Sequence, residues 1–321
     1  MKSFATILFF VNLLLTGCNQ QRTMEIKVID RSYLTGIPSA SGIELLNDHY
    51  YVIGDNSPFL FELGLNLQIE QRYQIASVDS LENDVIPKSR KKDLEAMCGF
   101  IDKVDTVILL LGSGSKSPIR DHAKLIRLKN GVHEIKEYDL FSFYLHAKEE
   151  AKLNDETFNL EAAAVLDDRL YLFNRGDNKI IECSLAKFMK YLNGEKDAND
   201  IKLKVTKADL PSIKGIEAGF SGAATDQENG RILFTASVEN TDNWIDDGQV
   251  LGSFIGVIEP EAMSDHYKPL SAEITENGKV LPVKVESIAI SSADAGSARC
   301  ILVTDSDGGE SEVIRIKLSI H

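Results

Sequence analysis

The chain has 321 residues, of which 43% are hydrophobic and 26% charged, and its formal net charge is −14. This composition is typical of a soluble globular protein with one large domain or two ordinary ones. Because phosphate binding needs a basic face, the acidic balance argues against nucleic acid as a partner and against electrostatic docking on anionic lipid.

The N-terminal segment predicts export. Lys2 precedes an apolar run from Phe4 to Leu15, which is too short to span a bilayer comfortably and is typical of a signal peptide. The sequence Leu-Thr-Gly-Cys that ends at Cys18 resembles the lipobox of bacterial lipoproteins. That resemblance implies cleavage after residue 17, lipidation of Cys18 and a tether at 18–23. It also implies anchoring in the cell envelope, on the periplasmic side or the cell surface, so that the membrane is a partner through the lipid alone. The alternative is a simple secretory signal with a chance cysteine.

Residues 24–321 divide into five similar units and are expected to form a single domain. Each unit opens with Glu or Ser followed by small apolar residues, then has a hydrophobic strand, a polar hairpin, a third strand and a polar fourth strand. Four short strands per unit at a period of 51–66 residues indicate an all-β fold, a β-propeller with five four-stranded blades. The opening strands are expected at 42–46, 94–100, 160–166, 220–225 and 285–291.

The fifth unit lacks a fourth strand, and residues 24–34 have the missing character. This N-terminal strand is therefore expected to complete the last blade and to remove the exposed sheet edges. Six blades and a pair of β-sandwiches are the alternatives. A short helix is expected at 185–192, while the apolar spacing at 141–153 fits a helix ambiguously. Three cysteines in apolar stretches are expected to be buried free thiols: Cys98, Cys183 and Cys300.

Glutamate recurs at the head of the opening strands, and the first strand of each blade lines the channel of a propeller. Glu44, Glu95, Glu161 and Glu286 are assigned to one equivalent position, which Ser221 takes in the fourth unit. Two carboxylates ~6 Å apart repel by roughly 3 kcal/mol at an effective dielectric near 20. Protonation, basic partners or a bound cation would relieve this repulsion, and oxygen donors suit a divalent cation such as Ca²⁺. The alternative is pairing with basic residues, for which Arg120, Arg175 and Lys284 are candidates.

The hairpins after the second strands are rich in Gly, Asp, Asn and Ser, as turns require. Asp55, Arg120 and Arg175 lie in these hairpins, beside the expected ring of glutamates. The planar fork of arginine suits carboxylate or phosphate, so these residues and Ser221 are assigned to a small anionic ligand.

The openers "SGIELL", "DLEAM", "NLEAAAV", "FSGAA" and "KVESIAI" resemble those of the esterase-like phytase domain and of the SdiA-regulated propeller family. The resemblance covers most of residues 35–315. It implies a propeller in which the glutamates hold a calcium ion.

The sequence supports two candidate functions. The first is a lipid-anchored propeller that binds a divalent cation, calcium above all, and a small anionic ligand at its channel. The second is a metal-assisted phosphoesterase that uses the same carboxylates, with an arginine on the substrate phosphate. The first is favoured because the sequence contains no Gly-x-Ser-x-Gly elbow and no other activated nucleophile that can be named.

Overall fold

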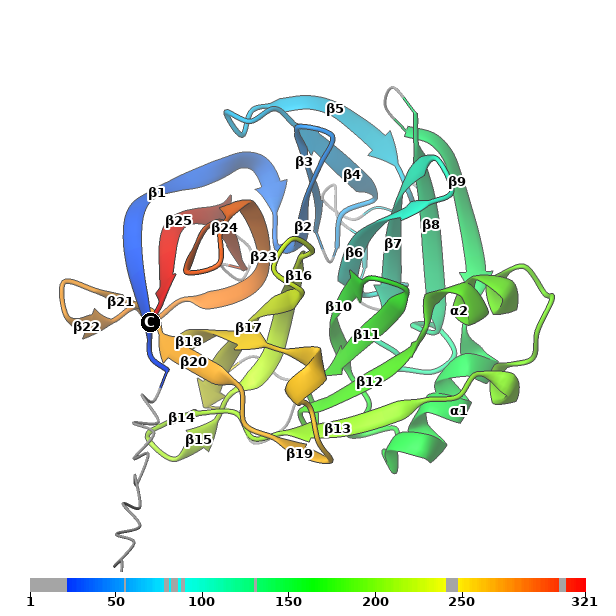
Figure 1. Cartoon of the computed structure of the whole chain (residues 1–321). Coiled ribbons are helices and arrows are strands. Elements are labelled where there is room, and N and C mark those ends of the chain that lie inside the picture. Colours follow the sequence, from blue (N-terminus) through cyan, green and yellow to red (C-terminus); the bar gives the residue numbers. More distant parts are fainter. Residues whose placement is uncertain are drawn as a thin grey trace, which may run out of the picture.

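The computed structural model describes residues 22–54, 56–77, 81, 86–87, 90–129, 132–240, 248–305 and 310–321. In these residues, antiparallel sheets are arranged radially around one axis as the five blades of a β-propeller (Figure 1). The predicted fold is confirmed, with five blades and not six. The signal peptide and Cys18 lie outside the described residues. Among the helices that the structure does describe, none has the length and apolar character needed to cross a membrane.

Each blade begins with an inner strand beside the axis, and the following strands are added outwards. Blade 1 contains β2 (Ala40–Leu46), β3 (His49–Gly54), β4 (Phe59–Leu63) and β5 (Ile69–Gln74). Blade 2 contains β6 (Leu94–Asp102), β7 (Asp105–Gly112), β8 (His122–Leu128) and β9 (Val132–Asp139). Blade 3 contains β10 (Leu160–Leu166), β11 (Arg169–Asn174), β12 (Lys179–Ser184) and β13 (Lys204–Ala208), with the short parallel strand β19 (His266–Tyr267) at its outer edge.

Blade 4 contains β16 (Gly219–Asp226), β17 (Arg231–Asn240), β18 (Gln249–Ile258) and β20 (Leu270–Glu273). Two small hairpins project beside it, β14 (Ser212–Ile213) with β15 (Ile216–Glu217) and β21 (Thr275–Glu276) with β22 (Lys279–Val280). Short 3-10 helices cover Ala198–Asp200 and Pro260–Ala262. The expected helix is present as α2 (Leu185–Leu192), and the ambiguous segment at 141–153 contains a second helix, α1 (Phe141–Ala151).

Blade 5 is built from both ends of the chain. It contains β23 (Lys284–Ala293), β24 (Ser297–Asp305), β25 (Glu310–Ile320) and, as its outer strand, β1 (Met24–Pro38). The antiparallel ladder between β1 and β25 starts at the pair Met24 and Ile320. Beyond it, Thr23 and His321 exchange two backbone hydrogen bonds of 3.1 and 2.9 Å. The predicted closure of the last blade by the N-terminal strand is confirmed.

The hydrophobic core is divided into five clusters, one between each pair of neighbouring blades. The second strands are buried on both faces, which explains apolar runs such as the "VILLL" of β7. Helices α1 and α2 cover the cluster between blades 2 and 3 with aromatic side chains. Tyr144 of α1 also donates to the Gly112 carbonyl at 2.6 Å. Cys98, Cys183 and Cys300 are buried and unpaired, as predicted.

A buried arginine joins blades 4 and 5. The side chain of Arg231 is 4% exposed and that of Asp226 is 3% exposed, and Nε donates to Oδ2 at 2.8 Å. The same guanidinium donates to the carbonyl oxygens of Asp294 at 2.7 Å and Ala295 at 3.0 Å, in the turn between β23 and β24. One side chain therefore satisfies a buried carboxylate and fixes a turn of the next blade.

We expect Arg231→Met to lower the free energy of unfolding by about 3–5 kcal/mol, because it leaves the Asp226 carboxylate buried without its cation. Urea denaturation followed by circular dichroism measures the change. The double variant Asp226→Asn with Arg231→Met should regain part of the loss, since the uncompensated charge is removed. A double variant that is destabilised by the sum of the two single losses would show that the two residues act independently.

Candidate functional site

The inner strands share a β-bulge close to their beginning, and this bulge sets which side chains reach the axis. In each strand the register shifts by one residue, so that the second or third residue of the strand has no partner in the ladder. Such an extra residue re-aims its side chain. The five bulged residues, in chain order, are Ser41, Glu95, Glu161, Ser221 and Glu286.

The bulges place Ser41, not Glu44, in the position equivalent to the other glutamates. Glu44 lies three residues farther along β2, where its carboxylate accepts a hydrogen bond from the Gly99 backbone N–H at 3.2 Å, between blades 1 and 2. The structure therefore does not bring Glu44 into the group at the axis. The signal was present in the sequence, because "SG" at Ser41 and Gly42 matches "SG" at Ser221 and Gly222.

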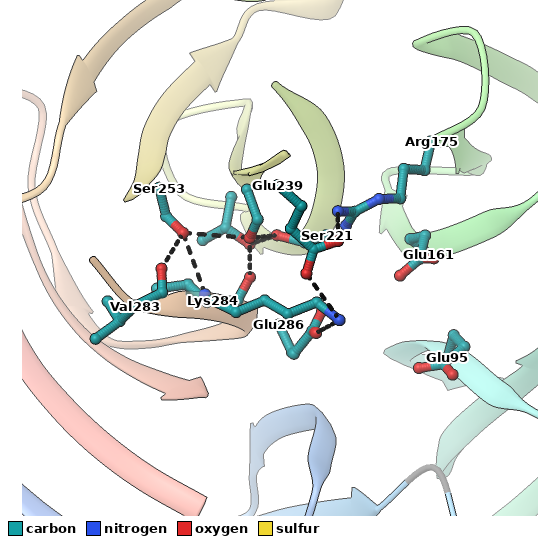
Figure 2. Close-up of polar contacts among 12 residues, drawn as sticks. Glu95, Glu161, Arg175, Ser221, Glu239, Ser253, Val283, Lys284 and Glu286 are labelled. Atoms are coloured by element: carbon teal, nitrogen blue, oxygen red, sulfur yellow. Dashed lines mark hydrogen bonds and ion pairs between the residues drawn. The ribbon is translucent and has the colours of Figure 1, made fainter. Parts of the chain in front are cut away.

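The three remaining glutamates face one space at the channel mouth. Figure 2 shows the side chains of Glu95, Glu161 and Glu286 directed towards the axis from three different strands. The two serines are used within the protein, since Ser41 donates to the Leu94 carbonyl at 3.1 Å and Ser221 donates to the Thr235 hydroxyl at 3.0 Å.

Arg175 reaches the same space from the hairpin that follows β11 (Figure 2). Its Nη2 donates to Glu239 Oε2 at 2.9 Å, whereas Nη1 is buried and has no hydrogen-bond partner. The residue as a whole is 4% exposed. A Cβ atom on Gly219 would lie 2.7 Å from Arg175 Cγ, so the path of the arginine to the axis requires glycine at that position.

Lys284 is the second cation at the mouth. Its Nζ lies 3.0 Å from Glu286 Oε1 and 3.2 Å from Glu239 Oε1. Ser253 fixes the backbone on both sides of this lysine, donating to the Val283 carbonyl at 2.7 Å and accepting from the Val285 N–H at 3.2 Å (Figure 2). Sequence reasoning named Lys284 as a partner of Glu286 but missed Glu239, which lies outside the repeated opener motif.

Arg120 belongs to a second polar group on the blade 2 side of the mouth. Its Nη1 lies 2.5 Å from Asp93 Oδ2 and 2.7 Å from the Ser115 hydroxyl, while its Nε is buried without a partner. Lys91 Nζ lies 2.8 Å from Asp93 Oδ1 and 3.7 Å from Glu95 Oε1. Arg120 and Arg175 are thus both engaged by carboxylates of the protein. Asp55 lies outside the described residues.

The carboxylates at the axis are not fully compensated. Glu95, Glu161, Glu239 and Glu286 surround Arg175 and Lys284, and Glu95 also pairs with Lys91, which is shared with Asp93, the partner of Arg120. Counted together these residues are five acids and four bases, so the group carries one more acid than bases. Burial raises the pKa of Glu286 to about 7, although Lys284 opposes the shift. Burial likewise raises the pKa of Glu161. By contrast, the pKa of Asp93 is lowered, because Lys91 and Arg120 outweigh the effect of its burial.

The carboxylate oxygen atoms at the axis favour a hard cation, but few side chains supply them. The carboxylates at the axis offer oxygen atoms, which suit Ca²⁺ better than zinc. Throughout the described ranges, however, no three His, Cys, Asp or Glu side chains are grouped closely enough to hold a metal ion. Glu286 and Glu239 hold Lys284, so the carboxylates that would hold a cation are those of Glu161, which also accepts from Asn159 Nδ2 at 2.6 Å, and Glu95, which also pairs with Lys91. Water would fill its other positions.

The carboxyl group of Glu44 lies between blades 1 and 2, and its burial predicts how stability depends on pH. Burial raises its pKa to about 8, opposed by the hydrogen bond from Gly99. The folded state then binds a proton that the unfolded chain has released, so the protein loses stability as the pH rises from about 4.5 to 8. We expect Glu44→Gln to match the wild type at pH 5 and to be more stable by roughly 3 kcal/mol at pH 9. Denaturant titrations at the two pH values measure this difference, and equal stability at both would contradict it.

Solved structures similar to the chain include the following three. Glutaminyl cyclase of Myxococcus xanthus is 10% identical, with a TM-score of 0.48 over 94% of this chain and 98% of that chain. The PQQ-bound aldose sugar dehydrogenase of Streptomyces coelicolor is 11% identical, with a TM-score of 0.48 over 93% and 99%. An exo-1,5-alpha-L-arabinanase from a bovine ruminal metagenomic library is 8% identical, with a TM-score of 0.47 over 87% and 92%. At these identities the similarity says nothing about activity.

No curated protein sequence matches the chain. Residues 36–318 match a family of unknown function, DUF6929. Because this match spans most of the 321 residues, the chain belongs to the DUF6929 family.

Proposed function

We propose that this protein is a binding protein whose propeller holds a divalent cation at one mouth of its central channel. The observation that carries the proposal is the excess of one carboxylate over the cations in the group around Arg175 and Lys284, with Lys91, Asp93 and Arg120 counted, where the bulges of the inner strands fix three of the glutamates. A bound cation would supply the missing positive charge. Calcium, expected from the sequence, remains the first candidate because the available donors are oxygen atoms.

We infer that the glutamates at the bulges serve binding and not folding. Burying several like charges is costly unless they are paired. Serines occupy the bulge position in blades 1 and 4, so the fold does not require glutamate there. We therefore assign Glu95 and Glu161 to cation binding, while Glu286 holds Lys284 beside them.

We also propose that the protein is anchored in the cell envelope through its N-terminal segment. Cys18, which we propose to be lipidated, lies six residues before Met24, where β1 begins. So short a tether would hold the outer strand of blade 5 close to the membrane surface.

Calcium binding is tested by thermal unfolding of chelator-treated protein with and without calcium chloride. At a concentration about 100 times Kd, we expect the midpoint to rise by about 5 °C. Glu161→Gln should abolish the rise, because it removes one of the two carboxylates proposed to hold the cation. Glu228→Gln is the matched control, since Glu228 is exposed in the turn between β16 and β17. The proposal fails if calcium leaves the wild-type midpoint unchanged and calorimetry detects no binding.

The affinity should depend on pH in a defined direction. Protons compete with a cation for the carboxylates, and the pKa of Glu161, one of the two carboxylates that would hold it, is raised. We therefore expect calcium affinity to increase from pH 6 to pH 8 by about tenfold, as measured by isothermal titration calorimetry. An affinity that is constant over this range would remove Glu161 from the site. A phosphomonoester turnover assay of the same samples tests the phosphoesterase alternative, which requires activity that disappears in Glu161→Gln.

A further inference from the structure

A cavity of about 210 Å³ lies on the blade 1 and blade 2 side of the molecule, apart from the glutamates at the axis. Its apolar lining includes Ile75, Ala76 and Leu94, and its cationic lining consists of Arg90, Lys92 and Lys124. Ile75 and Leu94 belong to the hydrophobic cluster between the two blades, so the cavity opens where that cluster ends. An apolar cavity with a few convergent polar groups is the usual form of a small-molecule site.

The cationic lining is built into the fold. Lys124 lies on β8 and is 4% exposed, which is rare for a lysine unless it is paired. Its Nζ contacts Glu137 Oε2, and Lys92 Nζ contacts Glu137 Oε1. Two ammonium groups therefore share one carboxylate. These contacts lower the pKa of Glu137 against the effect of its burial, so the carboxylate stays ionised.

Among the residues that the structure describes, cations outnumber acids in the lining of the cavity. Arg90 makes no ion pair with any residue that the structure describes, and adds a third cation to the lining. Asp93 also borders the cavity, but Lys91 at 2.8 Å and Arg120 at 2.5 Å already hold its carboxylate. Three cations thus line the cavity, and two of them, Lys92 and Lys124, share Glu137, in a chain whose net charge is −14. Such a local reversal of charge favours an anion.

We propose that this cavity binds a small organic anion, with its charged group on Lys92, Lys124 and Arg90 and its apolar body against Ile75, Ala76 and Leu94. The small volume limits the ligand to a compact molecule with about ten non-hydrogen atoms, by comparison with the larger pockets that hold drug-sized ligands. The site is independent of the cation proposed at the channel, because it uses none of the three glutamates at the axis.

Benzoate is a suitable probe, with benzyl alcohol as its uncharged counterpart and inorganic phosphate as an anion without an apolar body. Saturation-transfer NMR titrations of the whole protein measure the three affinities. We expect saturable binding of benzoate, and binding of benzyl alcohol and of phosphate that is at least tenfold weaker. Absence of saturable benzoate binding, or equal affinity for benzyl alcohol, overturns the proposal.

Substitutions inside and outside the cavity test where benzoate binds. Lys92→Met removes one cation, and Ala76→Trp fills the cavity without changing a charge; each should weaken benzoate binding at least tenfold. Lys317→Met on the exposed face of β25 and Leu65→Trp, at a residue that is 59% exposed, are the matched controls and should bind as the wild type does. Thermal unfolding confirms that each variant is folded. If Arg175→Met abolishes binding while Lys92→Met and Ala76→Trp retain it, the anion binds at the channel and the proposal is wrong.

Discussion

The pairing of β1 with β25 is the interaction on which the rest of the structure depends. Blade 5 has only three strands from the C-terminal part of the chain, and the fourth comes from residues 24–38. The ladder brings blade 5 against blade 1, because β1 leads directly into β2 at the axis. Without it, the cluster between those blades would lose its packing and the ring would have free edges. Ring closure is therefore what makes the five inner strands converge.

Convergence of the inner strands does not by itself direct their side chains towards the axis, and the bulges do this. An inner strand in regular pairing sends its side chains towards the two neighbouring blades, as Glu44 shows by its contact with Gly99 of blade 2. One extra residue turns the side chain at the bulge towards the axis. The same device gives a hydroxyl in blades 1 and 4 and a carboxylate in blades 2, 3 and 5. The fold therefore fixes where the groups lie, and sequence variation at the bulge fixes their chemistry.

The sequence predicted the architecture because hydrophobic strands and polar turns recur at a regular period in a propeller. The closing strand, the five blades and the helix at 185–192 all followed from that pattern. Glu44 was misplaced because glutamates were aligned by residue type and not by register, although the Ser-Gly pair at Ser41 and Gly42 matches the one at Ser221 and Gly222. Glu239 was missed for another reason: it lies outside the opener motif and meets the axis only after the ring is closed. Asp93 lies in the opener "DLEAM", but the pattern does not show that this residue holds Lys91 and Arg120. The cationic cavity was also beyond sequence reasoning, because Lys92 and Lys124 come from separate elements that share Glu137.

The two backbone hydrogen bonds between Thr23 and His321 have a consequence for how the chain can be connected. They hold Thr23 and His321 side by side, so a short peptide joining these residues would disturb no strand. The order of the blades along the chain would then become arbitrary, and a circularly permuted chain could open at any turn between blades. In such a permuted molecule the four strands of blade 5 would be continuous in sequence, and the chain ends would lie between two other blades while the channel kept its groups.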